Sequence, residues 1–381
     1  MIGVGMVGAL GADAVTNCAG SRAGISRSSI VEHYRLRSPV DGKEEPVVGH
    51  QASLFTRGFE GDSRLVRLAQ GALLDLSAQL RRMDWRQWRH RFYLSLPDVR
   101  RTSLGGELIA DEEVRRTWMD AVTAREHGDE THQTSNQLRA RRTLDQAAAL
   151  ARWPAEPVFT FASVAGHAGA VAALSAAIAD VAAAQTDIAI VLGIDSLLDE
   201  ETLEWLYMCG RLKCDAMPAG CQPGEAGVAI ALTSGSVASE IGASPLAVVG
   251  PLAEGSEIRS FLSATSASGI GLAEVVAGSW TGADVDTPWI VSDHNGEFYR
   301  AMDWGHALVR LRAQFEGFAD PILWYPALSF GDTGAASPLA GICVTVRAWA
   351  RTYAPARTAV IAAASDGPER AALRLANPRF H

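Results

Sequence analysis

The sequence has little cysteine, no early basic residue and no long apolar run. Five cysteines occur among 381 residues, and so small and odd a number fits a reducing compartment better than a disulfide framework. No basic residue precedes Arg22, so the apolar start lacks the positive region that opens a secretory signal. The Ala-rich stretch 168–184 is interrupted by Asp180 and is too weakly apolar to span a bilayer. We therefore expect a cytoplasmic protein without a membrane segment.

The chain also lacks an excess of positive charge. Its net charge is −9 and its pI is near 5.5, so neither nucleic acid nor an anionic membrane would attract it. The segment 81–91 does interleave arginines with two tryptophans, a composition that suits phosphate or the acidic helix of a carrier protein. The simpler interpretation, which we favour, is a helix end with solvated arginines and inward-facing tryptophans.

Short apolar runs alternate with Ala/Leu-rich helical stretches along the chain. The runs predict strands at 2–7, 92–96, 158–162, 188–192, 228–232, 246–249, 289–291, 322–325, 342–346 and 359–363. Helices are predicted at 65–82, 140–152, 168–184 and 303–316. This rhythm predicts a layered α/β protein. Because the rhythm runs twice, we expect one half over 1–238 and a second over 239–381, with polar excursions near 32–48 and 100–139.

Three patterns that resemble ligand sites are weak. His127, Asp129, Glu130 and His132 have spacing that permits a metal site, but a polar loop of this kind is usually only solvated. Gly3, Gly5 and Gly8 match a dinucleotide fingerprint, yet just two residues precede the first glycine where a full strand is needed. The cysteines at 209, 214 and 221 do not have a standard zinc spacing. We expect no metal and no cofactor.

The most informative segment is Gly331-Asp332-Thr333-Gly334 and the small residues that follow it as far as Ala340-Gly341. It resembles the Gly-His-Thr loop of the β-ketoacyl synthases, members of the thiolase superfamily, with Asp332 at the place of the catalytic histidine. An ionised carboxylate has no proton to donate. The resemblance therefore implies the family's fold and, at the same position, a changed chemistry.

A second segment carries the same resemblance. Residues 158–169, followed by an Ala-rich helix and the strand-like run from Asp187, are similar to the family's nucleophile elbow, in which a buried strand delivers a cysteine to a helix N-terminus. The register places His167 where the cysteine is expected, and neighbouring registers offer Gly166 or Ala165. None of the five cysteines lies in this segment.

Further motifs extend the resemblance to nearly the whole chain. Pro223–Gly227 is similar to the family's Gly-Glu-Gly turn, and residues 357–375 resemble its closing hairpin. Asn295-Gly296 aligns with the other catalytic His-Gly, while the adjacent His294 should point elsewhere. The resemblance implies a thiolase-like fold of two pseudo-repeated α/β halves in α-β-α-β-α layers, with the vestigial site and any ligand at His167, His294, Asn295, Asp332 and Thr333.

The resemblance thus implies a synthase-like protein without the residues for condensation. Without the thiol no acyl-enzyme forms, so we expect a binding, partner or accessory subunit, for an acyl-carrier and synthase system or beside a secreted effector. We expect a homodimer, or a heterodimer with a related subunit, formed through the strand at 158–162. The alternative is an acyl-thioester hydrolase or decarboxylase in which His167 is the general base and Asp332 orients it.

Overall fold

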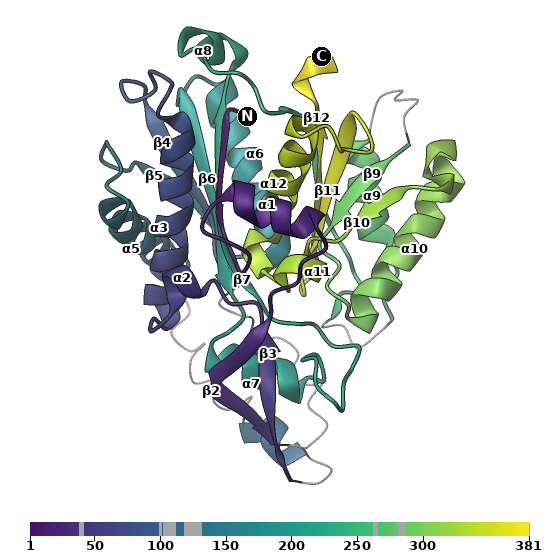
Figure 1. Cartoon of the computed structure of the whole chain (residues 1–381). Helices are drawn as coiled ribbons and strands as arrows, with labels where there is room; N and C mark the ends of the chain where they lie inside the picture. The colour runs from purple at the N-terminus through teal and green to yellow at the C-terminus, as the bar shows by residue number, and fades with distance from the viewer. Residues whose placement is uncertain are drawn as a thin grey trace.

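Two five-stranded sheets form the centre of the molecule (Figure 1). The computed structural model describes residues 1–37, 42–98, 101, 112–117, 132–261, 266–280 and 287–380. The first sheet has the order β1 (Gly3–Val7), β7 (Glu225–Thr233), β6 (Ile188–Ser196), β4 (His90–Ser95) and β5 (Phe159–Ser163). The second has the order β8 (Val248–Ser256), β12 (Glu369–Ala376), β11 (Thr358–Ala364), β9 (Trp289–Ser292) and β10 (Ile322–Trp324).

The two sheets share one pattern of strand directions. In each, the first three strands run antiparallel to their neighbours, and the third, fourth and fifth run parallel. The two sheets therefore have the same topology, each built from one part of the chain. The segment between them contains the short helix α8 (Gly235–Glu240).

Helices cover both sheets and fill the space between them. The central layer holds α6 (Gly169–Ala182) and α12 (Ser337–Ala350), which contact strands of both sheets and are rich in buried alanine, valine and leucine. The first sheet is covered outside by α3 (Gly61–Leu80), against which α5 (His132–Leu150) packs, and the second by α9 (Ile270–Ser279) with α10 (Phe298–Gln314). This arrangement confirms the predicted α-β-α-β-α layers.

Close packing of α3 on the first sheet depends on a glycine. A Cβ placed on Gly5 would lie 2.3 Å from the carbonyl oxygen of Ala72 and 2.5 Å from the amide nitrogen of Leu76. Both atoms belong to the backbone of α3, so no side-chain rotation relieves the contact. Gly5 therefore allows the close contact between β1 and α3.

Two of the sequence predictions about local structure are wrong. The predicted strand at 342–346 lies inside α12, where a long apolar run is buried on all sides between two sheets. The predicted excursion at 32–48 is mostly a β-hairpin of β2 (Ser29–Arg37) and β3 (Glu44–Gly49), whose inward face packs on α7 (Glu200–Met208). Val31, Tyr34 and Leu36 of β2 are buried and stabilise this hairpin despite its charged outer face.

Other predictions are refined by the structure. In the basic segment 81–91, Trp85 is buried, Arg81 and Arg82 are exposed, and β4 begins at His90. Helix α5 begins within the predicted excursion at 100–139, most of which lies outside the described residues. The structure also contains α1 (Ala14–Arg22), α2 (Ser53–Thr56) and α11 (Ala327–Phe330).

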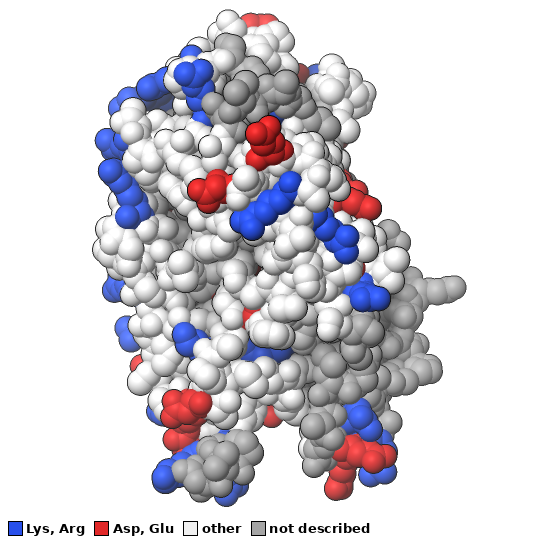
Figure 2. All heavy atoms as spheres, turned by 90° about the vertical axis from the view of Figure 1, so that its right-hand side faces the viewer, with Lys and Arg blue, Asp and Glu red and all other residues white. Residues whose placement is uncertain are grey.

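No helix in the described part of the chain is long and apolar enough to cross a membrane. The face that lies on the right of Figure 1 carries both acidic and basic side chains, separated by uncharged surface (Figure 2). That face therefore has no broad region of one sign.

Candidate functional site

The candidate site lies where the carboxyl ends of β9 and β11 meet the start of α6. The 3-10 turn η3 (Gly166–Ala168) carries His167 into it, and the loop that follows α11 carries Asp332. The segment between β9 and α10 contributes Asn295. Carboxyl ends of parallel strands and helix N-termini meet here, which is where α/β folds usually place ligands.

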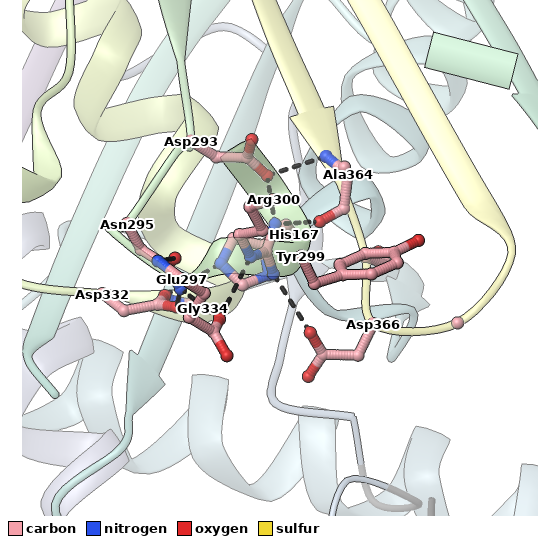
Figure 3. Close-up of polar contacts among 12 residues, drawn as sticks. His167, Asp293, Asn295, Glu297, Tyr299, Arg300, Asp332, Gly334, Ala364 and Asp366 are labelled. Atoms are coloured by element: carbon pink, nitrogen blue, oxygen red, sulfur yellow. Dashed lines mark hydrogen bonds and ion pairs between the residues drawn. The ribbon is translucent and has the colours of Figure 1, made fainter. Parts of the chain in front are cut away.

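His167 and Asp332 form a direct buried pair. The Nε2 atom of His167 lies 2.8 Å from Oδ1 of Asp332, and both side chains are almost fully buried. The backbone N–H of Gly334 donates to the same Oδ1 atom at 2.9 Å, and Nδ2 of Asn295 donates to Oδ2 at 2.6 Å (Figure 3). Three of the positions identified from the sequence therefore belong to one hydrogen-bonded group.

The second ring nitrogen of His167 is also engaged. The NH2 group of Arg300 lies 3.3 Å from Nδ1. A guanidinium has donors only, so Nδ1 must accept and the ring proton must lie on Nε2, where it is donated to Asp332. In this geometry Nε2 of His167 faces the Asp332 carboxylate and Nδ1 faces a cation.

Arg300, from the first turn of α10, ties this pair to the second sheet. It donates to Oδ2 of Asp293 at 3.1 Å, to the carbonyl of Ala364 at the end of β11, and to Oδ1 of Asp366 at 3.1 Å (Figure 3). The Asp366 carboxylate lies in the turn between β11 and β12, and the hydroxyl of the neighbouring Ser365 accepts from the backbone N–H of Ala168 at 3.0 Å. One arginine thus holds the turn, the strand end and the imidazole in fixed positions.

A second buried arginine closes the network on its other side. Arg211, in the loop after α7, donates to Glu297 at 2.6 and 2.9 Å and to Asp366 at 2.8 and 2.9 Å. Its guanidinium also lies 4.8 Å from the centre of the Trp205 ring and 4.4 Å from that of Phe261. Two pairs of hydrogen bonds to carboxylates, together with two aromatic rings, fix the position of the Arg211 guanidinium.

The charges of the network hold the carboxylates of Asp332 and Asp366 ionised. Burial alone would raise the pKa of Asp332, but His167, Arg300 and the Gly334 N–H together lower the pKa of that carboxyl far below its usual range. Burial opposes ionisation of Asp366 too, while Arg211 and Arg300 bring its pKa well below normal. Asp332 therefore cannot supply a proton at neutral pH.

The space left beside His167 is small. Among the described residues, His167, Asp332, Arg211 and Asp366 line a cavity of about 20 Å³ together with residues from both halves of the fold. A void of this size accommodates about one water molecule.

The structure brings Cys221 into this region, which the sequence did not indicate. Its sulfur and carboxylate oxygens of Glu297 and Asp332 lie within 4.8 Å of one another, so within the described residues this group has donor atoms suited to a metal. The carboxylates, however, already accept from Arg211, Asn295, His167 and Gly334. Those N–H donors occupy the lone pairs that a cation would need, so we assign no metal to the group.

The other predicted site residues lie at the margin. The ring of His294 packs against Tyr325, with ring centroids 5.5 Å apart; burial and the nearby Arg300 lower the pKa of His294. Thr333 is buried, and its carbonyl accepts from the N–H of Ala336. The acidic and histidine cluster at 127–132 lies outside the side chains that the structure describes.

The comparisons with known proteins identify the fold. No protein-family model and no curated protein matches the chain. Solved structures do match over 99% of it: a type II PKS acyl-carrier protein in complex with its ketosynthase (TM-score 0.70, 13% identity, 98% of that chain) and the ishigamide ketosynthase/chain length factor (TM-score 0.70, 16% identity, 98% of that chain). An oxazolomycin ketosynthase domain from Streptomyces albus also matches (TM-score 0.66, 15% identity, 73% of that chain). The chain therefore has the thiolase-like fold of ketosynthases.

Proposed function

We propose that this protein is a ketosynthase-like subunit that does not condense acyl groups and acts by associating with a partner. The observation that supports this most is the occupied imidazole: both ring nitrogens of His167 are engaged, one by Asp332 and the other by Arg300. The position that would have to hold an acyl group is thus part of a closed ionic network.

The chemistry of condensation explains why this matters. The reaction requires a nucleophile to carry the acyl group and neutral donors to stabilise developing negative charge. Here the start of α6 offers an imidazole, and Asp332 is an ionised acceptor. A carboxylate at this place would repel an oxyanion.

Cys221 does not replace the missing nucleophile. It is fully buried, and burial followed by the charges of Glu297 and Asp332 raises its pKa well above the usual thiol value. Four carboxylates and two guanidinium groups make up the directly bonded network around it, so the local charge opposes a thiolate. Reactive cysteines require the opposite surroundings.

The partner surface in this proposal is the free edge of the first sheet. Among the described residues, β5 pairs with β4 on one side and with no strand on the other. Residues 158–163, which follow Pro157, contain neither a charged residue nor a proline, and Val158 is 51% exposed. Edge strands are normally protected by charge or proline, so an uncharged edge favours pairing with a second strand across a two-fold axis.

The partner in this proposal is a second copy of the chain or a related, active subunit. The solved structures with this fold include a ketosynthase with its acyl-carrier protein and a ketosynthase/chain length factor, which is the support for an acyl-carrier system. An effector-associated role and a cytoplasmic location rest on the sequence alone.

A strand-edge substitution tests the association. We expect the native protein to elute as a dimer by size-exclusion chromatography with light scattering, and the exposed residue Thr160, changed as Thr160→Lys, to shift it toward monomer. Ser236→Lys on the exposed face of α8 is the matched control and should leave the mass unchanged. A native monomer that also fails to capture a related ketosynthase subunit would contradict the proposal.

A second candidate function is hydrolysis or decarboxylation of an acyl thioester. It is favoured by the 2.8 Å contact of His167 with Asp332, the arrangement that orients a general base. It is opposed by Arg300 at the only basic nitrogen. Turnover of acyl-CoA or acyl-carrier thioesters that disappears in His167→Ala would establish it in place of the first proposal.

A further inference from the structure

A groove at the far end of the molecule has the features of a ligand site. Its volume is about 460 Å³, and it lies where the end of α12, the start of β10 and the C-terminal 3-10 turn η7 (Pro378–Phe380) meet. The candidate site lies at the carboxyl end of β11, whereas this C-terminal groove lies at its amino end. The volume falls within the range of small-molecule sites, roughly 300 to 1,000 Å³.

The walls of the C-terminal groove are apolar and held in place. The apolar side chains that line the groove are those of Ile322, Trp349, Pro355 and Phe380. Trp349 is 5% exposed, and its indole N–H donates to the carbonyl of Ala356 at 2.8 Å. This hydrogen bond ties the loop after α12 to the helix, so the wall exists before any ligand binds.

The charged side chains of the groove have one sign. Among its described lining residues the only charged ones are Arg357 and Arg379, both exposed, and no carboxylate is present. The Arg357 guanidinium lies 4.4 Å from the centre of the Phe380 ring, which positions it beside the apolar wall. In a chain with a net charge of −9, the described lining of this groove therefore has two cations and no anion.

One buried residue links the two arginines. Asn377 is 8% exposed. Its backbone N–H donates to the carbonyl of Arg357 at 2.9 Å, and its Oδ1 accepts from the backbone N–H of Arg379 at 3.1 Å. The backbones that carry both cations are therefore fixed relative to each other, as convergent recognition of one anion requires.

We propose that the C-terminal groove binds a small organic anion, with its apolar body on the Trp349 wall and its carboxylate, sulfonate or phosphate on Arg357 and Arg379. Guanidinium groups suit these oxyanions because their planar donors match two oxygens at once. The proposal is independent of the role of His167, because no residue is shared by the two sites.

The test uses 8-anilinonaphthalene-1-sulfonate, an aromatic sulfonate whose fluorescence rises in an apolar site. We expect saturable binding with one site per chain. The variant Arg357→Glu/Arg379→Glu should bind at least about tenfold more weakly, since each charged hydrogen bond contributes more than a tenfold factor when lost. Both arginines are exposed, so the variant should fold.

Two controls separate a site from general attraction. Arg81→Glu/Arg82→Glu changes the net charge equally at exposed positions elsewhere and should leave the affinity unchanged. N-phenyl-1-naphthylamine has a similar aromatic body without the sulfonate and should bind the native protein and the groove variant equally weakly. Binding that does not saturate, or that both double variants weaken alike, would overturn the proposal.

Discussion

Replacing Asp332 by asparagine perturbs the central network with almost no change in shape. The carboxylate accepts from His167 and Gly334 on one oxygen and from Asn295 on the other. An amide at this position must direct its NH2 group either toward the Asn295 NH2, 2.6 Å from the present oxygen, or toward the other two donors. Either orientation sets donor against donor and removes a charge from beside Arg300.

The cost of this change follows from burial. Asp332 is 3% exposed, and removing one partner of a buried charge network costs about 3 to 5 kcal/mol. We expect Asp332→Asn to lower the free energy of unfolding by about 3 kcal/mol at pH 7. Urea denaturation followed by tryptophan fluorescence measures it, and the ten tryptophans provide the signal.

A control and a pH series make the measurement decisive. Asp62 is 60% exposed and pairs with Arg139, so Asp62→Asn should cost less than about 1 kcal/mol of unfolding free energy.

The pKa of Asp332 is lower in the folded state than its unfolded value of about 3.9. The ionised form therefore stabilises the fold above about pH 4, and that contribution is lost as pH falls toward the folded pKa. The difference between native protein and Asp332→Asn should narrow in the same range. A loss at pH 7 no larger than that of Asp62→Asn would refute the reasoning.

Three further outcomes are expected. Gly5→Ala should destabilise the protein by about 3 kcal/mol or prevent folding, because its Cβ would meet the backbone of α3 at 2.3 Å; a melting temperature within about 2 °C of the native value would contradict this. Glu225→Gln should cost about 3 kcal/mol, because it leaves Arg64 buried without its charge partner, and adding Arg64→Met should recover part of the loss in urea denaturation. Alkylation with iodoacetamide, followed by mass mapping, should modify the half-buried cysteines first and the buried ones only on unfolding. The reason is that burial raises the pKa of Cys18 to about 12 and raises the pKa values of Cys221 and Cys343 well above the usual thiol value. The half-buried pair is Cys209 and Cys214; the buried set is Cys18, Cys221 and Cys343.

Much of the fold was predictable because its strands are short, apolar and bounded by small residues. Nine of the ten predicted strands overlap observed ones. The tenth, at 342–346, failed because a helix buried between two sheets is apolar on every side and has lost the 3.6-residue pattern. The hairpin of β2 and β3 was missed because its outer face is charged and only every second or third residue is buried.

The pair at the centre was predictable in part. His167, Asn295 and Asp332 were aligned through the resemblance to β-ketoacyl synthases, and the structure brings all three into one hydrogen-bonded group. The two arginines could not be predicted, because Arg211 and Arg300 lie in segments without a motif, and their charged partners are 3 to 155 residues away. The spacing of Cys221 to the other cysteines only argues against a zinc site, whereas in the structure its neighbours in space are carboxylates.

These omissions change the meaning of the altered loop. The resemblance to β-ketoacyl synthases places Asp332 at the position of their catalytic histidine. In the structure it is the acceptor at the centre of a buried ionic network that also fixes the imidazole and the turn between β11 and β12. The polar groups of His167, Asn295 and Asp332 therefore satisfy one another within a connected, buried hydrogen-bond network.

The most direct test of the central claim is the intact mass of the protein after incubation with a reactive acyl thioester, such as acetyl-CoA or malonyl-CoA. A centre without a competent nucleophile predicts an unchanged mass for the native protein and for His167→Ala. An added acyl group that maps to Cys221, or to any other side chain around the 20 Å³ cavity, and that is lost when that residue is replaced, would contradict the account.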